Sequence, residues 1–228
     1  MRPLIVSILA VATACSSLPR DPEATLERVR RGSLRVGLIE NPPWVVRAGS
    51  EPQGAEPELV RRLAASLGAR PQWFWGGEEQ HMQALEHFEL DLVIGGLDDR
   101  DPWKKKAGFT RPYFEERVLV GVRQAAPFPA SLNGLTVAVK AGGEVAGLLR
   151  KKDANPDPVQ HLDSAANAVA APEWQIEHLG FVPTRFELLK RNHVMVTPPG
   201  ENAWLRTLGD FLYEQRGEIR GLLEREAR

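Results

Sequence analysis

The chain has 228 residues, 43% of them hydrophobic, and a formal net charge of -1 at pH 7. This length can bury one large core or two smaller ones, and the near-neutral charge argues against a nucleic-acid-binding protein. Beyond the first residues, no apolar run approaches the roughly 20 residues that a transmembrane helix needs.

The first residues have the plan of an export signal. A positively charged start precedes an apolar run over residues 4–14, which ends in small residues and is too short to span a bilayer. Cys15, the only cysteine, follows at once in a pattern that resembles a bacterial lipobox. We therefore expect a signal peptide over residues 1–14, then a lipidated Cys15 and a polar tether over residues 15–32. An ordinary signal followed by a chance cysteine is the alternative.

Residues 34–39 predict the first strand, and Pro42 and Pro43 turn the chain off its end, because two prolines cannot continue a central strand. Trp44 then stands at the carboxyl tip of the strand, either as a core residue or at a binding site. Residues 57–68 predict a helix with one apolar face, a proline at its first position and a glycine as its stop.

Two further strands are predicted before the middle of the chain. Residues 72–75 form one, ending in Trp75, and residues 90–94 form the other, closed by Gly95 and Gly96, with a helix between them. Successive strand–helix–strand units imply a parallel sheet with right-handed crossovers. The charged residues that follow, Asp98, Asp99 and Arg100, lie where open α/β sheets bind ligands. They are either a solvated loop or part of a binding site.

The hydrophobic pattern breaks at the proline-bearing link 124–133 and again at 197–200. We therefore expect a large lobe made of residues 33–123 and 197–228, and a small lobe made of residues 124–196. In the small lobe, Gly142 and Gly143 separate a predicted strand from a short helix. Glycines there let backbone N–H groups converge on an anion, although a plain tight turn is an equal alternative.

The order of these segments resembles the family 3 extracellular solute-binding proteins, the polar amino-acid receptors of ABC importers. The resemblance covers residues 33–223 and rests on the Gly-Gly strand end, the Phe-Thr-Arg-Pro-Tyr-Phe segment at 109–114, the Pro-Pro-Trp turn and the Gly-Ala-Glu-Pro-Glu-Leu segment at 54–59. It implies an α/β fold of the type II periplasmic-binding-protein kind, with two α/β lobes and a cleft between them. Residues 163–180 are short by one strand relative to the family pattern, so the second lobe should be reduced.

The resemblance also implies roles for particular residues. Trp44 would pack on the ligand, the Gly142-Gly143 pair would form the ligand loop of the second lobe, and Glu173 would hold a substrate ammonium unless it is a surface residue. The family's carboxylate-binding arginine is replaced by Trp103, so that clamp is either shifted to Arg100 or lost. The full expected ligand site is Trp44, Trp75, Gly96, Asp98, Asp99, Arg100, Gly142, Gly143 and Glu173.

Enzyme signatures are missing from the sequence. The five histidines have no zinc-type spacing, and there is no nucleophile elbow, phosphate loop or dinucleotide fingerprint. We expect no enzyme activity, cofactor, metal or nucleic acid, but a monomeric periplasmic receptor, held at the membrane by lipid. It would deliver a small polar, amino-acid-like solute to an ABC transporter permease or a membrane sensor. A cyclohexadienyl dehydratase type of enzyme, with Glu173 as general acid, and a degenerate lobe pair that binds a protein partner stay open.

Overall fold

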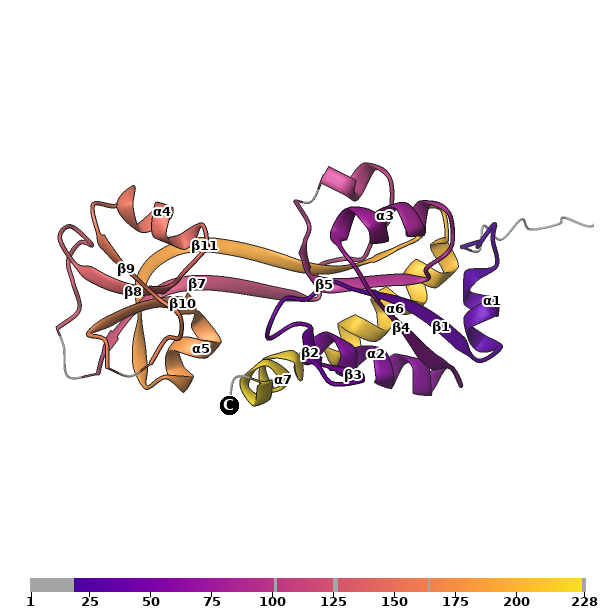
Figure 1. Ribbon diagram of the computed structural model, residues 1–228, viewed down its shortest axis with the longest axis horizontal. Helices are drawn as coiled ribbons and strands as arrows, with labels where there is room; N and C mark the ends of the chain where they lie inside the picture. Colours follow the sequence, from indigo (N-terminus) through magenta and orange to yellow (C-terminus); the bar gives the residue numbers. More distant parts are fainter. Residues whose placement is uncertain (1–18, 101, 125–126, 164, 227–228) are drawn as a thin grey trace, which may run out of the picture.

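The computed structural model describes residues 19–100, 102–124, 127–163 and 165–226. The predicted signal peptide, Cys15 and the start of the tether lie outside these residues. Figure 1 shows an elongated molecule in which a larger and a smaller body are joined by two long strands. Within the described ranges, no helix has the length and apolar character needed to cross a membrane.

The larger body contains the predicted parallel sheet. Strands β1 (Ser33–Leu38), β4 (Arg70–Trp75) and β5 (Leu92–Asp98) pair in parallel in the order β4-β1-β5. Strand β5 does not stop at its glycine pair, contrary to the prediction, because Leu97 and Asp98 pair with the antiparallel strand β11 (Phe181–Thr197). Asp98 is therefore the last residue of a strand rather than part of a loop.

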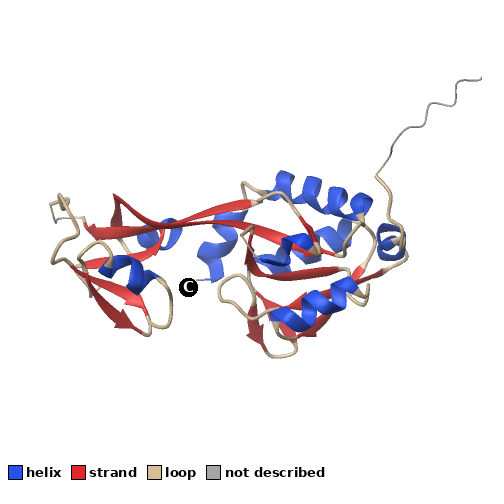
Figure 2. Cartoon of the chain, turned by 90° about the horizontal axis from the view of Figure 1, so that it is seen from above, coloured by secondary structure: helices blue, strands red, loops and turns tan. Residues whose placement is uncertain are grey.

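Helices cover the sheet of the larger body, as Figure 2 shows. The predicted helices are confirmed, and the helices of this body are α1 (Thr25–Arg30), α2 (Ala55–Ser66), α3 (Glu78–Glu86), α6 (Asn202–Gln215) and α7 (Ile219–Glu226). Shorter elements complete it: the hairpin of β2 (Val46–Ala48) and β3 (Glu51–Gln53), the 3-10 turn Pro102–Lys105, and β6 (Gly108–Phe109), which pairs with β11.

A buried carboxylate fastens the N-terminal helix to this sheet. Asp91 is fully buried just before β5 and pairs with Arg28 of α1 at 2.6 Å and with Arg35 of β1 at 2.7 Å. It also accepts a hydrogen bond from the Arg35 backbone N–H at 2.8 Å. One side chain thus joins three elements of the larger body.

Two strands run from one body into the other. Strand β7 (Phe114–Arg123) pairs antiparallel with β11, and through them one sheet continues in the order β4-β1-β5-β11-β7-β10-β8-β9, with β6 beside β11 as its ninth strand. The hydrogen-bonded ladder is therefore continuous. The buried side chains nevertheless form separate clusters, with Leu59 and Met82 in the larger body and Val139 and Ile176 in the smaller one.

The smaller body consists of β8 (Thr136–Lys140), β9 (Asn155–Val159), β10 (Ala168–Pro172) and the helices α4 (Val145–Arg150) and α5 (Glu173–His178). The expected loss of a strand from residues 163–180 is wrong, because β10 is that strand. Its first four residues are buried and pair with β7 and β8. Between β9 and β10 the described residues form no helix, and this accounts for the shortness of the segment.

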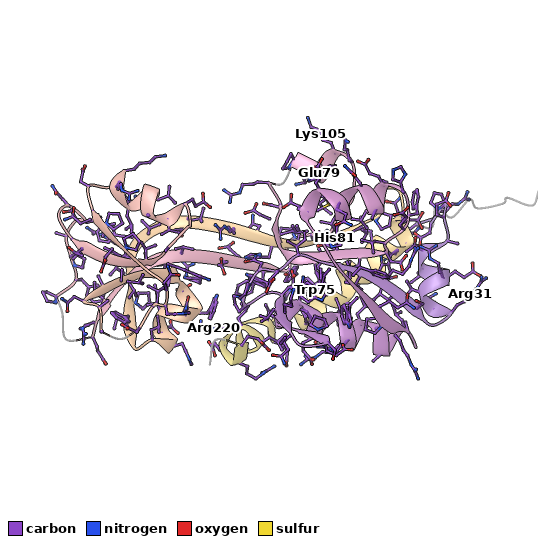
Figure 3. All side chains as sticks on the ribbon, in the orientation of Figure 1. Arg31, Trp75, Glu79, His81, Lys105 and Arg220 are labelled. Carbon is purple, nitrogen blue, oxygen red and sulfur yellow. The ribbon has the colours of Figure 1, made fainter. Side chains whose placement is uncertain are left out.

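The two bodies also touch outside the strands. Glu177 of α5 forms an ion pair with Arg220 of α7, and Figure 3 shows Arg220 on the side of α7 that faces the smaller body. Trp174, also on α5, is buried and belongs to the hydrophobic cluster of the larger body. Helix α5 thus packs against the larger body through its own side chains.

Candidate functional site

Trp44 lies at the end of β1, as expected, but it is a buried residue and not an open platform. Only 3% of its surface is exposed. Its ring stacks on His193 of β11 with 4.0 Å between the ring centroids and meets the edges of Phe114 and Tyr113. Trp44 therefore forms part of the wall between the β1 turn and the two strands that join the bodies.

Glu56, at the start of α2, fixes the glycine pair of β5. One of its oxygens accepts hydrogen bonds from the N–H groups of Gly95 at 2.7 Å and Gly96 at 2.9 Å, and the other accepts the Tyr113 hydroxyl. Burial raises the pKa of Glu56 although these hydrogen bonds oppose the effect. Burial, and then the charge of Glu56, raise the pKa of Tyr113.

Gly96 has a φ of 64°, and a Cβ built on it would lie 2.7 Å from the ring of Trp44. Both observations require glycine at this position, because other residues disfavour that conformation and no space is left for a side chain. Asp98 lies two residues further along β5, directly opposite His193. Trp44, Gly96 and Asp98 are therefore brought together around His193.

The charged residues at the end of β5 and just after it form hydrogen bonds with other side chains. The guanidinium of Arg100 donates to Asp98 at 3.0 and 2.7 Å, and its side chain is 61% exposed. The hydrogen bond from Arg100 is the main reason why the pKa of Asp98 is lowered. Asp99 accepts a hydrogen bond from the amide of Asn192 at 3.2 Å. A ligand anion at Arg100 would therefore have to replace Asp98.

The predicted residues of the smaller body lie at the ends of its strands. Gly142, with a φ of 85°, and Gly143 are exposed in the turn after β8, and Glu144 follows them. Glu144 accepts a hydrogen bond from Arg191 of β11 at 2.7 Å. Glu173, the first residue of α5, accepts one from Arg117 of β7 at 2.6 Å.

Trp75 is partly buried and packs against the main hydrophobic cluster of the larger body. The guanidinium of Arg47 lies 4.0 Å from the centre of its ring. Together with His81 of α3, which Figure 3 labels beside it, Trp75 lines a groove of about 600 Å³ along the edge strand β4.

Sequence reasoning missed the residues on the joining strands. Arg191 lies opposite Glu116, and His193 lies opposite Phe114 in the antiparallel pair of β7 and β11. Glu116 is only 5% exposed and receives Trp174 Nε1 at 3.5 Å, while the nearest nitrogens of Arg191 and His193 are 3.8 and 3.7 Å away. The available signal was weak: in a strand, Glu116 lies on the same face as the apolar residues Phe114 and Val118.

We call the antiparallel pair of β7 and β11 between the two bodies the strand crossing. Negative side chains outnumber positive ones among the site residues around it. Asp98, Asp99, Glu116, Glu144 and Glu173 supply five carboxylates, against three arginines, Arg100, Arg117 and Arg191. Each arginine is bound to one of these carboxylates. The charge of Glu144 also contributes, less than Asp98, to a raised pKa of Arg100, so the charges of the two bodies act on each other. Among the described residues, no group of three or more His, Cys, Asp or Glu side chains could hold a metal ion.

Solved structures with this fold include several solute receptors. An ancestral cationic amino acid solute-binding protein matches with a TM-score of 0.72 at 21% identity, over 90% of this chain and 100% of that one. The unliganded, open L-cystine solute receptor of Neisseria gonorrhoeae matches with 0.67 at 15% identity, over 85% and 92%. An ancestral cyclohexadienyl dehydratase matches with 0.62 at 22% identity, over 89% and 95%. At these identities the likeness shows the shared fold, and it agrees with the predicted two-lobed α/β class.

Sequence comparison gives the family. The membrane-bound lytic murein transglycosylase F of Vibrio cholerae is 28% identical over 123 residues, which are 52% of this chain and 23% of that protein. The chain thus spans less than a quarter of that relative's length. The model of one family matches residues 34–223, nearly the whole described structure. The chain therefore belongs to the bacterial extracellular solute-binding proteins, family 3.

Proposed function

We propose that this protein is an exported receptor that captures a small polar, amino-acid-like solute between its two bodies. The observation that carries the proposal is the meeting of strand ends from both bodies at β7 and β11. Asp98 comes from the larger body, Glu144 and Glu173 from the smaller one, and each is bound to an arginine. A polar ligand that binds these charged groups better when the two bodies are close together would shift the protein toward the closed arrangement.

The proposed receptor has two lobes and is held at a membrane. Residues 33–123 with 197–228 would form one lobe and residues 124–196 the other, and β7 and β11 are the strands that would bend between them. A lipid on Cys15 would hold the receptor in the periplasm at a membrane, as a monomer. There it would deliver its solute to an ABC importer or present it to a membrane sensor. The family's association with extracellular solute binding supports this location.

One alternative has an observation in its favour. Trp44, Trp174 and Glu116 are all buried at the strand crossing, where a solute would have to enter. These buried side chains occupy the space between the bodies, which fits a degenerate pair of lobes that binds a protein partner instead of a solute. The transglycosylase relative and the dehydratase neighbour keep an enzyme on this fold as a further alternative.

A thermal-shift panel of amino acids, polyamines and organic acids, each at millimolar concentration, tests the proposal. A solute present at 100 times its Kd should stabilise the protein by about 2.7 kcal/mol. We expect at least one amino acid or polyamine to raise the Tm, with calorimetry confirming one site per chain. If no solute shifts the Tm and calorimetry shows no heat, the receptor function is refuted, and turnover of prephenate would establish the enzyme instead.

A further inference from the structure

Two buried polar side chains, His193 and Glu116, face each other at the strand crossing. Nε2 of His193 lies 3.7 Å from a carboxylate oxygen of Glu116, and the side chains are only 2% and 5% exposed. Nε2 has no hydrogen-bond partner within the part of the chain that the structure describes. A buried polar atom without a partner is unfavourable, and a water, an ion or a ligand group that supplies the hydrogen bond removes this cost.

The other ring nitrogen of His193 defines what Nε2 can do. Nδ1 lies 3.1 Å from the carbonyl oxygen of Gly96, which can only accept a hydrogen bond. When the ring is neutral, Nδ1 therefore carries the hydrogen and Nε2 presents a lone pair toward Glu116. A carboxylate also only accepts, so Glu116 and the neutral ring of His193 together need a donor between them.

The neighbouring donors, Trp174 and Arg191, make only long contacts to Glu116. Trp174 Nε1 reaches the other oxygen of Glu116, at 3.5 Å, and Arg191 Nη1 stays 3.8 Å from the oxygen that faces His193. The better contact of Arg191 is to Glu144, at 2.7 Å. Arg191 is thus a cation tethered within the site, held between a buried carboxylate of β7 and an exposed one of the smaller body.

We propose that the ammonium group of a cationic solute binds between Glu116 and His193, and that Arg191 is an internal cation that competes with it. This inference rests on the proposed receptor function and adds to it the class of solute, an amine such as a diamine or a basic amino acid. An ammonium has three donors and can satisfy the carboxylate and the imidazole together. The rings of Trp44, Phe114 and Trp174 around the pair would favour a cation over an anion.

The roles of Glu116 and Arg191 predict opposite effects of two substitutions. Glu116→Gln keeps the shape but loses the charge, and it should weaken the binding of putrescine and L-lysine on the order of a hundredfold. Arg191→Gln removes the competing cation and should strengthen putrescine binding by about tenfold, which corresponds to about 1.4 kcal/mol of repulsion removed. Putrescine has no carboxylate, so its affinity is independent of any contact between Arg191 and an acid group.

Lys190→Gln is the matched control. Lys190 precedes Arg191 on β11 and pairs with Glu115 at 2.7 Å, so the substitution removes the same charge next to the site without freeing Glu116. Its putrescine affinity should stay within about twofold of the original protein, since surface ion pairs contribute little. Side chains alternate between the two faces of a strand, so Lys190 and Arg191 point to opposite sides.

Titration calorimetry with putrescine, L-lysine, L-glutamine and L-glutamate on these variants decides the matter. Preference for the two amines, loss in Glu116→Gln and gain in Arg191→Gln would support the inference. If the original protein binds L-glutamine or L-glutamate as tightly, or if Arg191→Gln weakens putrescine binding, the inference is wrong while the receptor function stands. If none of the variants binds any solute of the wider panel, both are refuted. Arg191 is partly exposed, so its variant tests the idea even if Glu116→Gln does not fold.

Discussion

Replacement of Glu56 by alanine should destabilise the protein by about 3 kcal/mol or more. Three donors lose their acceptor: the N–H groups of Gly95 and Gly96 and the hydroxyl of Tyr113. Each buried donor left without a partner costs about 1–3 kcal/mol, and these donors are close together in a site with no exposure at Glu56. The end of β5 should also lose its fixed position, so solute binding should fall with stability.

Glu56→Gln separates the hydrogen bonds from the charge. Its amide oxygen can still accept both N–H groups, and its amide nitrogen can donate to the oxygen of Tyr113. Because burial raises the pKa of Glu56 in the folded protein, the native state binds the proton more tightly than the unfolded state. The stability from this group is present below the ordinary carboxyl pKa and is lost as the pH rises through the raised one. The original protein should therefore lose stability relative to Glu56→Gln over that pH range.

Urea unfolding followed by tryptophan fluorescence measures both effects, since the chain contains six tryptophans. Glu58→Ala is the control: Glu58 lies two residues away on α2, is partly exposed and pairs with Arg62 at 2.9 Å. Such a pair contributes about 0.5 kcal/mol. If Glu56→Ala loses no more stability than Glu58→Ala, the three hydrogen bonds do not hold the end of β5, and the description of this anchor is refuted.

Three further outcomes are expected. Gly96→Ala should lower the free energy of unfolding in urea by about 3 kcal/mol, because of its left-handed backbone and the contact with Trp44. Gly68→Ala, with a φ of 70° and open space around it, should lose only about 1–2 kcal/mol. Equal losses would show that the Trp44 ring moves aside at little cost. Asp91→Asn, which breaks a buried pair with two arginines, should lose about 3–5 kcal/mol by the same assay, and a loss under 1 kcal/mol would contradict this. Cys15→Ala should release the protein from membranes in cell fractionation, and unchanged fractionation with unchanged mass would exclude the lipid.

Local patterns predicted most of the larger body. Helix α2 follows from Leu59, Val60 and Leu63 on one face, and the parallel strands follow from short apolar runs ended by turns. The error at the end of β5 has a clear physical origin. Gly95 and Gly96 stop a strand in isolation, but here their N–H groups are held by Glu56, and the strand continues into a ladder with β11. That support comes from residues about 40 and 100 positions away, so no local pattern contains it.

The sequence predicted the part of the candidate site that lies at strand ends, but not the part in the middle of strands. Strand ends marked Trp44, Gly96 and Asp98, which the structure brings around His193. Glu116 and Arg191 could not be found in this way, because their significance depends on the register of β7 against β11. Charged residues in the middle of two strands suggest solvent exposure until the pairing places them opposite each other, beneath a helix from the smaller body.

The arrangement of charges suggests where binding energy could arise. The pairs Asp98–Arg100 and Glu173–Arg117 have side chains that are partly exposed, so exchanging one partner for a ligand group changes the free energy by about 1 kcal/mol or less. Glu116 is buried, and the polar groups of Trp174, Arg191 and His193 that face it stay at 3.5 Å or beyond. A donor that approached it to normal hydrogen-bond distance would gain a charge-assisted bond that the free protein lacks. Differences in affinity between solutes should therefore be decided at the strand crossing, while the exposed pairs around it adjust to whichever solute is bound.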